Sequence, residues 1–157
     1  MSWRGETNVR DRIFACLPYL LPLVDGLRFG MFLFALFPPL ALIFIPLAPF
    51  LAIYSLPLAS LVIFFALFLL VVRNENISHF IRFNAMQAIL LDILLFLAQL
   101  ILMILSKVSG LEFMLKVYSN FIFIGVLAVV VYAVVQSLRG RYAEIPTISD
   151  AVYMQVR

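Results

Sequence analysis

The sequence predicts an all-α integral membrane protein with four transmembrane helices and a proline-rich apolar connection between the first two. Composition is the first reason: of 157 residues, 66% are hydrophobic and 12% are charged, and the mean hydropathy is +1.15. A soluble domain is about half apolar and about a quarter charged. This composition therefore excludes an ordinary soluble protein, a disordered chain and a nucleic-acid-binding domain. The second reason is that the few charges separate long uncharged runs such as 29–72 and 117–138.

The first transmembrane helix is expected at about 11–31. Residues 33–52 follow as an apolar segment that Pro38 and its neighbours interrupt, because proline removes a backbone donor and clashes with the preceding turn. We expect this segment to lie in the interface or to re-enter the membrane, where other protein or water must satisfy its backbone. The alternative assignment makes 29–48 the first true span and 11–28 an interfacial helix.

The other three helices are expected at about 53–73, 80–105 and 117–138. A spanning helix needs about 20 mostly apolar residues, and each of these segments is long enough. The third contains one carboxylate, Asp92. The fourteen Leu, Ile and Phe residues from 83 to 105 outweigh it, at about −0.3 to −0.6 kcal/mol each against about +3 kcal/mol for Asp. The whole chain, 1–157, is then one membrane domain with a tail at 139–157.

The distribution of Lys and Arg predicts the orientation, because cytoplasmic loops carry the excess of these residues. With four spans, one side holds Arg4, Arg10, Arg12, Arg73, Arg82, Arg139, Arg141 and Arg157, and the other holds Arg28, Lys107 and Lys116. We therefore expect both termini on the cytoplasmic side or its organellar equivalent, the stroma.

The third predicted span carries the most informative polar residues. Asn84, Gln87, Asp92 and Gln99 fall within an arc of roughly 140° at 100° per residue. A polar stripe with a carboxylate near the bilayer centre faces the bundle interior or a wet cavity. One interpretation is the wall of a polar path. The other is a set of interhelical hydrogen bonds, each worth about 0.6 kcal/mol.

Two further groups of residues mark the predicted membrane interface. Asp25 and Arg28 are three residues apart and can pair on a helix, as an interface marker at the end of the first span. Arg73, His79 and Arg82 flank a polar turn before the third span. We interpret His79 as part of that turn, because nucleophilic catalysis needs a nucleophile and a positioned base together.

The sequence contains few residues that could carry out catalysis or bind a cofactor. The single cysteine, Cys16, allows no intramolecular disulfide, and no phosphate loop or metal-ligand spacing is present. We therefore expect no enzymatic activity, no cofactor and no metal. Ser149-Asp150 is expected to cap a short helix in the tail.

Three stretches carry a family resemblance when they are taken in order. They are Leu17-Pro18-Tyr19-Leu20-Leu21-Pro22-Leu23, then Val72-Arg73 with His79-Phe80-Ile81-Arg82-Phe83, and finally Tyr142-Ala143-Glu144-Ile145-Pro146 with Asp150-Ala151-Val152-Tyr153-Met154-Gln155. In these stretches the chain resembles the twenty-kilodalton subunit family of the Tic complex, the protein translocon of the chloroplast inner envelope, and its cyanobacterial relatives. The resemblance runs from about residue 10 to the end.

The resemblance implies a four-helix subunit of a protein translocon, with other translocon subunits and precursor proteins as partners and with both termini on the stromal or cytoplasmic side. It brings no catalytic residues. Segment 33–52 is apolar here, whereas plant members have an acidic connection, and no transit peptide is visible. We therefore expect a cyanobacterial or plastid-encoded member, in the plasma membrane or the inner envelope. The alternatives are a small-solute or ion transporter that uses Asp92, or a purely structural membrane subunit.

Such a subunit is expected to need a partner or a second copy of itself. A compact bundle of four helices fills its own core, so it cannot enclose a pore wide enough for a polypeptide. The lipid bilayer is the other expected partner, and nucleic acid is not.

Overall fold

The first helical column begins at Val9 and ends at Leu36 in the computed structural model, which describes residues 7–156. Its pieces are α1 (Val9–Cys16), η2 (Leu17–Tyr19), α2 (Leu20–Gly26), η3 (Leu27–Gly30) and α3 (Met31–Leu36). Asn8 caps the start, where its side chain accepts a hydrogen bond from the Asp11 amide at 2.8 Å. Pro18 stands in the first 3₁₀ turn, where its missing N–H is tolerated. The column extends past the predicted 11–31 at both ends.

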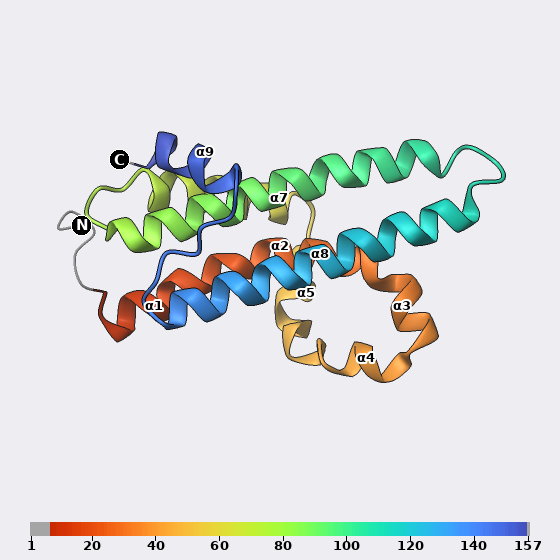
Figure 1. The fold of residues 1–157 in the computed structure, drawn as a ribbon, viewed down its shortest axis with the longest axis horizontal. Coiled ribbons are helices and arrows are strands. Elements are labelled where there is room, and N and C mark those ends of the chain that lie inside the picture. Colours follow the sequence, from red (N-terminus) through yellow and green to blue (C-terminus); the bar gives the residue numbers. More distant parts are fainter. Residues whose placement is uncertain (1–6, 157) are drawn as a thin grey trace.

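The column ends where the sequence predicts a break. Phe37 precedes Pro38 and has φ −127° and ψ 79°, because a residue before proline is forced out of the helical region. The chain then turns through α4 (Pro38–Leu42), η4 (Ile45–Leu47) and α5 (Ala48–Tyr54). Figure 1 shows these pieces as an arc that leaves the side of the bundle and returns to it. We call residues 37–58 the hook.

The hook ends at a sharp bend. Leu58 has φ +62°, and α6 (Ala59–Leu67) with the π-helical turn η5 (Phe68–Val72) leads away from it. The axes of Ile45–Tyr54 and Ala59–Val72 differ by 97°. The bend lies inside the predicted span 53–73, so that span is broken rather than straight.

Two long helices complete the membrane part. α7 (His79–Leu105) and α8 (Glu112–Leu138) have 27 residues each, about 40 Å at 1.5 Å per residue. Either can cross a bilayer core of about 30 Å. With the first column there are three apolar helices of spanning length in the described range, or four if the bent pair counts as one span. The described chain contains helices and no strand, which confirms the all-α membrane fold.

The tail folds back onto the bundle. After α8, Gly140 has φ +74°, and a Cβ there would lie 2.6 Å from Thr7 Oγ1 and 2.8 Å from Arg12 Nε, so only glycine fits. The last helix, α9 (Ile148–Gln155), packs on α7, where Val152 joins a buried cluster with Phe83. In Figure 1 it lies along the end of α7 that is opposite the α7–α8 turn.

The predicted cap of this helix is wrong. The helix begins at Ile148, and its N-terminal cap is Thr147, which makes no side-chain capping bond. Ser149 lies inside the helix, and its hydroxyl accepts a hydrogen bond from the Ile145 amide at 2.6 Å. The Ser149 hydroxyl therefore pairs with a backbone amide that precedes the helix and does not cap the start of the helix.

The basic residues gather at one end of the described bundle. Arg12 lies against Gly140, and His79 lies against Tyr142, so the starts of α1 and α7 meet the end of α8. Lys107 lies in the α7–α8 turn at the other end. Arg28 lies inside the first column rather than at its far end. Arg4 and Arg157 lie outside the described residues.

Candidate functional site

The four polar residues of α7 do not form one continuous site. Asn84 and Gln87 are fully buried against the first column and the tail, at 0% exposure. Asp92 lies farther along the helix and shares a hollow with residues of the first column and α6, and Gln99 lies farther still. The stripe therefore divides into a buried network of Asn84 and Gln87 and two separate residues farther along α7, Asp92 and Gln99.

The buried network joins four parts of the chain. The Tyr19 hydroxyl donates to Asn84 Oδ1 at 2.7 Å and accepts from Gln87 Nε2 at 2.9 Å. The Ser137 hydroxyl donates to Asn84 Oδ1 at 3.0 Å, and the Ser149 hydroxyl donates to Gln87 Oε1 at 3.0 Å. Each member has partners, and a satisfied polar network in an apolar core fixes one arrangement of its elements. The contacts of Asn84 and Gln87 are thus interhelical hydrogen bonds.

The interface residues His79 and Arg82 hold neighbouring segments. His79 Nδ1 lies 2.9 Å from the Tyr142 hydroxyl, and its Nε2 lies 3.3 Å from the Val156 carbonyl oxygen. Arg82 Nε donates to the Val72 carbonyl at 2.9 Å. Arg73 is placed differently, with its guanidinium 5.9 Å from the centre of the Phe68 ring. The tail and the turn before α7 are therefore attached to the start of α7.

The three stretches that carry the family resemblance meet in this region. Tyr19 comes from the first, His79 from the second and Tyr142 from the third. Gln87 connects the first and third directly, since it donates to both the Tyr19 hydroxyl and the Ala143 carbonyl. These stretches are far apart in sequence and form one packed unit at one end of the bundle.

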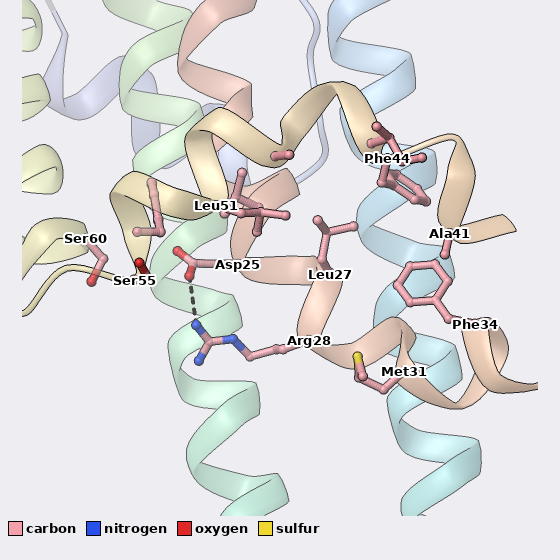
Figure 2. A pocket seen from close by; sticks show the side chains of 14 residues that line it. Asp25, Leu27, Arg28, Met31, Phe34, Ala41, Phe44, Leu51, Ser55 and Ser60 are labelled. Atoms are coloured by element: carbon pink, nitrogen blue, oxygen red, sulfur yellow. Dashed lines mark hydrogen bonds and ion pairs between the residues drawn. The ribbon is translucent and has the colours of Figure 1, made fainter. Parts of the chain in front are cut away.

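The second polar group lies on the first column, beside the hook. Arg28 Nη2 and Asp25 Oδ1 are 3.0 Å apart, and this ion pair borders a pocket of about 640 Å³ between the first column and the hook. Figure 2 shows the pair on the side of the pocket that holds Ser55 and Ser60, away from Phe34. We call this cavity the hook pocket. The helix runs on to Leu36, so the pair lies within the column and does not mark its end.

Asp92 brings a second carboxylate to the same place. It lies near the middle of the 27-residue α7 and lines a hollow of about 420 Å³ together with Asp25, Arg28 and Ser60. Three of these four residues also line the hook pocket, so the two hollows are adjacent. Two carboxylates therefore lie around one guanidinium within apolar helices of spanning length, where charged side chains are costly.

Several buried polar atoms near this region have no hydrogen-bond partner among residues 7–156. They include Asp92 Oδ1 on α7 and the hydroxyl of Tyr54, which is itself a residue of the hook. They also include Gln99 Oε1 on α7 and the Ser119 Oγ and Asn120 Oδ1 atoms on α8. An unpaired buried polar atom costs about 1–3 kcal/mol, so these atoms call for water or another chain.

Sequence reasoning did not find Tyr19, Ser137, Ser149 or Tyr54 as site residues. Tyr19 offered the clearest signal, since a tyrosine between two prolines in the interior of an apolar segment needs a partner for its hydroxyl when buried. Tyr54 offered none, because its importance depends on the hook bringing it toward Asp25 and Asp92.

The fold and these polar groups define a small multi-pass helical membrane protein with an arc-shaped insertion and charged groups within its apolar helices. A family described as "Chloroplast import apparatus Tic20-like" matches residues 7–152. The chain belongs to this family.

Relatives support the same assignment over nearly the whole chain. A Tic20 family protein of Synechocystis is 53% identical, over 100% of this chain and 99% of the relative. Protein TIC 20-II, chloroplastic, of Arabidopsis thaliana is 41% identical over 96% of this chain and 74% of its own length. The Tic20 family protein Ycf60 of Pyropia yezoensis is 31% identical over 97% of this chain and 78% of its own length.

Proposed function

We propose that this protein is a membrane-embedded, non-enzymatic subunit of a protein translocon, and that the hook pocket forms part of the surface that a translocating polypeptide contacts. Membership in a family described as an import apparatus supports the general role. The observation that carries the specific role is the charged group within the apolar helices, with Asp25, Arg28 and Asp92 beside a cavity of about 640 Å³.

A polypeptide is the substrate class that this surface suits. Its backbone presents N–H and C=O groups that cannot be left unsatisfied in hydrocarbon. The cluster offers donors in Arg28 and Ser60 and acceptors in Asp25 and Asp92. Apart from Tyr54 and Ser55, the remaining wall of the hook pocket is apolar, with Leu27 and Phe34 among its residues, so apolar side chains fit there.

A single chain does not enclose a conduit for a polypeptide. The half of the bundle near α9 is filled by the Asn84 and Gln87 network, and a packed bundle leaves no channel. In the other half, the unpaired atoms of Gln99 and Asn120 lie on α7 and α8. We propose that another translocon subunit or a second copy of this chain completes the path there.

The proposed location follows from the same role and from the basic end of the bundle. Both termini are proposed to face the cytoplasm or stroma, in a cyanobacterial plasma membrane or a plastid inner envelope. The comparisons favour the translocon role over a small-solute transporter that uses Asp92.

Site-specific photocrosslinking in intact membranes tests the proposal. A photoreactive residue at Ser60 lies at the hook pocket, and one at Phe121, which is 73% exposed on α8, is the matched control. Gln87 is unsuitable, because a bulky probe there would disrupt three side-chain hydrogen bonds in the core.

We expect mass spectrometry to find precursor or translocon peptides attached at Ser60 but not at Phe121. Attachment of lipid alone at both positions would contradict the proposal.

A further inference from the structure

A second cavity lies outside the translocon site, at the basic end of the bundle. It has a volume of about 620 Å³ and lies between the first column and η5, over the start of α7. Phe14, Leu17 and Leu21 form one wall, Leu67 and Val71 the other, and Ile81 contributes from α7. We call it the interface groove.

The groove has the length and the lining of an acyl-chain site. From Arg10 to Leu21 the first column rises about 16 Å at 1.5 Å per residue. This is close to half the thickness of a bilayer core of about 30 Å. The wall is apolar from Phe14 to Leu21, about 10 Å of that length, and in a membrane such a groove loses dispersion contacts unless hydrocarbon fills it.

The mouth of the groove is polar and carries one cation and one carboxylate. Arg10, Asp11, Asn76 and Ser78 line it at the level where the helices begin. The Arg10 guanidinium lies 5.6 Å from the centre of the Phe14 ring, so it lies along the groove wall. No carboxylate among residues 7–156 forms an ion pair with it. Asp11 lines the same mouth but forms no ion pair with Arg10, so the guanidinium can pair with an anion that binds there.

From these observations we propose that the interface groove binds one anionic glycerophospholipid of the phosphatidylglycerol type. The phosphate lies at Arg10, one acyl chain lies between Leu17 and Val71, and the headgroup hydroxyls lie toward Asp11 and Asn76. Hydroxyls suit those two residues, since carboxylate and amide oxygens accept hydrogen bonds. Basic pockets between membrane helices are a recurrent site for anionic headgroups.

Lipid photolabelling with the full-length protein tests this site. The chain is reconstituted into phosphatidylcholine vesicles that contain a trace of phosphatidylglycerol with a diazirine in one acyl chain. A second sample contains diazirine-labelled phosphatidylcholine instead. After irradiation, digestion and mass spectrometry report which peptides carry lipid. We expect the phosphatidylglycerol probe to concentrate on peptides with Leu17 and Val71, and the phosphatidylcholine probe to label lipid-facing residues without that preference.

Two variants with matched controls make the test decisive. Arg10→Gln should lower groove labelling by the phosphatidylglycerol probe about fivefold, whereas Arg139→Gln removes a charge at the same end but away from the groove and should not. Leu17→Trp fills the groove and should abolish labelling at Val71, whereas Leu138→Trp should not. Three results would each overturn the proposal. They are equal effects of the two arginine variants, equal groove labelling by both probes, and labelling that is retained in Leu17→Trp.

Discussion

Tyr19 shows how much of the fold depends on single buried groups. Its hydroxyl both donates to Asn84 and accepts from Gln87, and its side chain is 1% exposed. The hydroxyl links α7 to the first column through two hydrogen bonds, one that it donates and one that it accepts. Its loss therefore removes one hydrogen-bond partner from each of two amide side chains. The cost therefore falls on α7 as well as on Tyr19 itself.

Tyr19→Phe is expected to lower the free energy of unfolding by about 1 kcal/mol, since it removes two interhelical hydrogen bonds of about 0.6 kcal/mol each while Ser137 and Ala143 keep both amide groups partnered. Thermal unfolding in detergent measures the change. Tyr132→Phe is the control, because Tyr132 is 42% exposed and its hydroxyl lies 3.5 Å from the Glu144 carbonyl. Equal destabilisation by both variants would contradict the assignment of this network.

In contrast to Tyr19, Asp92 is expected to matter for the translocation path and not for the stability of the inserted protein. Asp92 lies within an apolar helix beside Asp25, and its Oδ1 atom has no partner within residues 7–156. Asp92→Leu should therefore insert at least as well as the natural chain, because an Asp in a membrane helix costs about 3 kcal/mol. It should nevertheless reduce precursor crosslinking at Ser60. Measurement of membrane-inserted protein alongside crosslinking yield separates the two effects. Normal crosslinking in Asp92→Leu would rule out a role for this carboxylate in the path.

At the scale of elements, the α9 tail depends on one apolar face. Val152 is 0% exposed and packs in the cluster with Phe83 and Met86, whereas Met154 on the same helix is 74% exposed. Val152→Asp buries an unpaired carboxylate and should release α9 from α7 at a cost of several kcal/mol. Limited trypsin digestion should then cleave after Arg141. Met154→Asp adds the same charge on the exposed face and should leave the tail resistant, so cleavage in both variants would show that the tail is not held by this face.

The elements also show what could be predicted from sequence and what could not. Uncharged runs predict α7 and α8 closely, because membrane insertion depends on local composition, and the Pro38 break follows from a local steric rule. The path of the hook cannot be predicted from the sequence, since the bend at Leu58 depends on how α5 and α6 pack. The pairing of Gln87 with Tyr19 and Ser149 is equally hidden, because the partners are distant in sequence.

At the scale of the whole molecule, the separation of charge predicts how the protein sits in its membrane. Arg12 and His79 lie at the end of the bundle where α8 finishes, and Lys107 lies in the α7–α8 turn at the opposite end. Basic residues close to membrane helices stay on the cytoplasmic side during insertion. The end that carries α9 should therefore face the cytoplasm or stroma, and the α7–α8 turn should face the other side.

Cysteine accessibility measures this orientation directly, because Cys16 is the chain's only cysteine and Cys16→Ser provides a background without thiols. Val108→Cys lies in the α7–α8 turn and Met154→Cys lies on α9, and the natural side chains at these positions are 51% and 74% exposed. In intact cyanobacterial cells whose outer layers have been made permeable, a membrane-impermeant maleimide should label Val108→Cys at once. Met154→Cys should react only after detergent opens the plasma membrane, because its helix packs on the basic end of the bundle. The reverse pattern would invert the orientation. It would also place the mouth of the interface groove, with Arg10, in the outer leaflet.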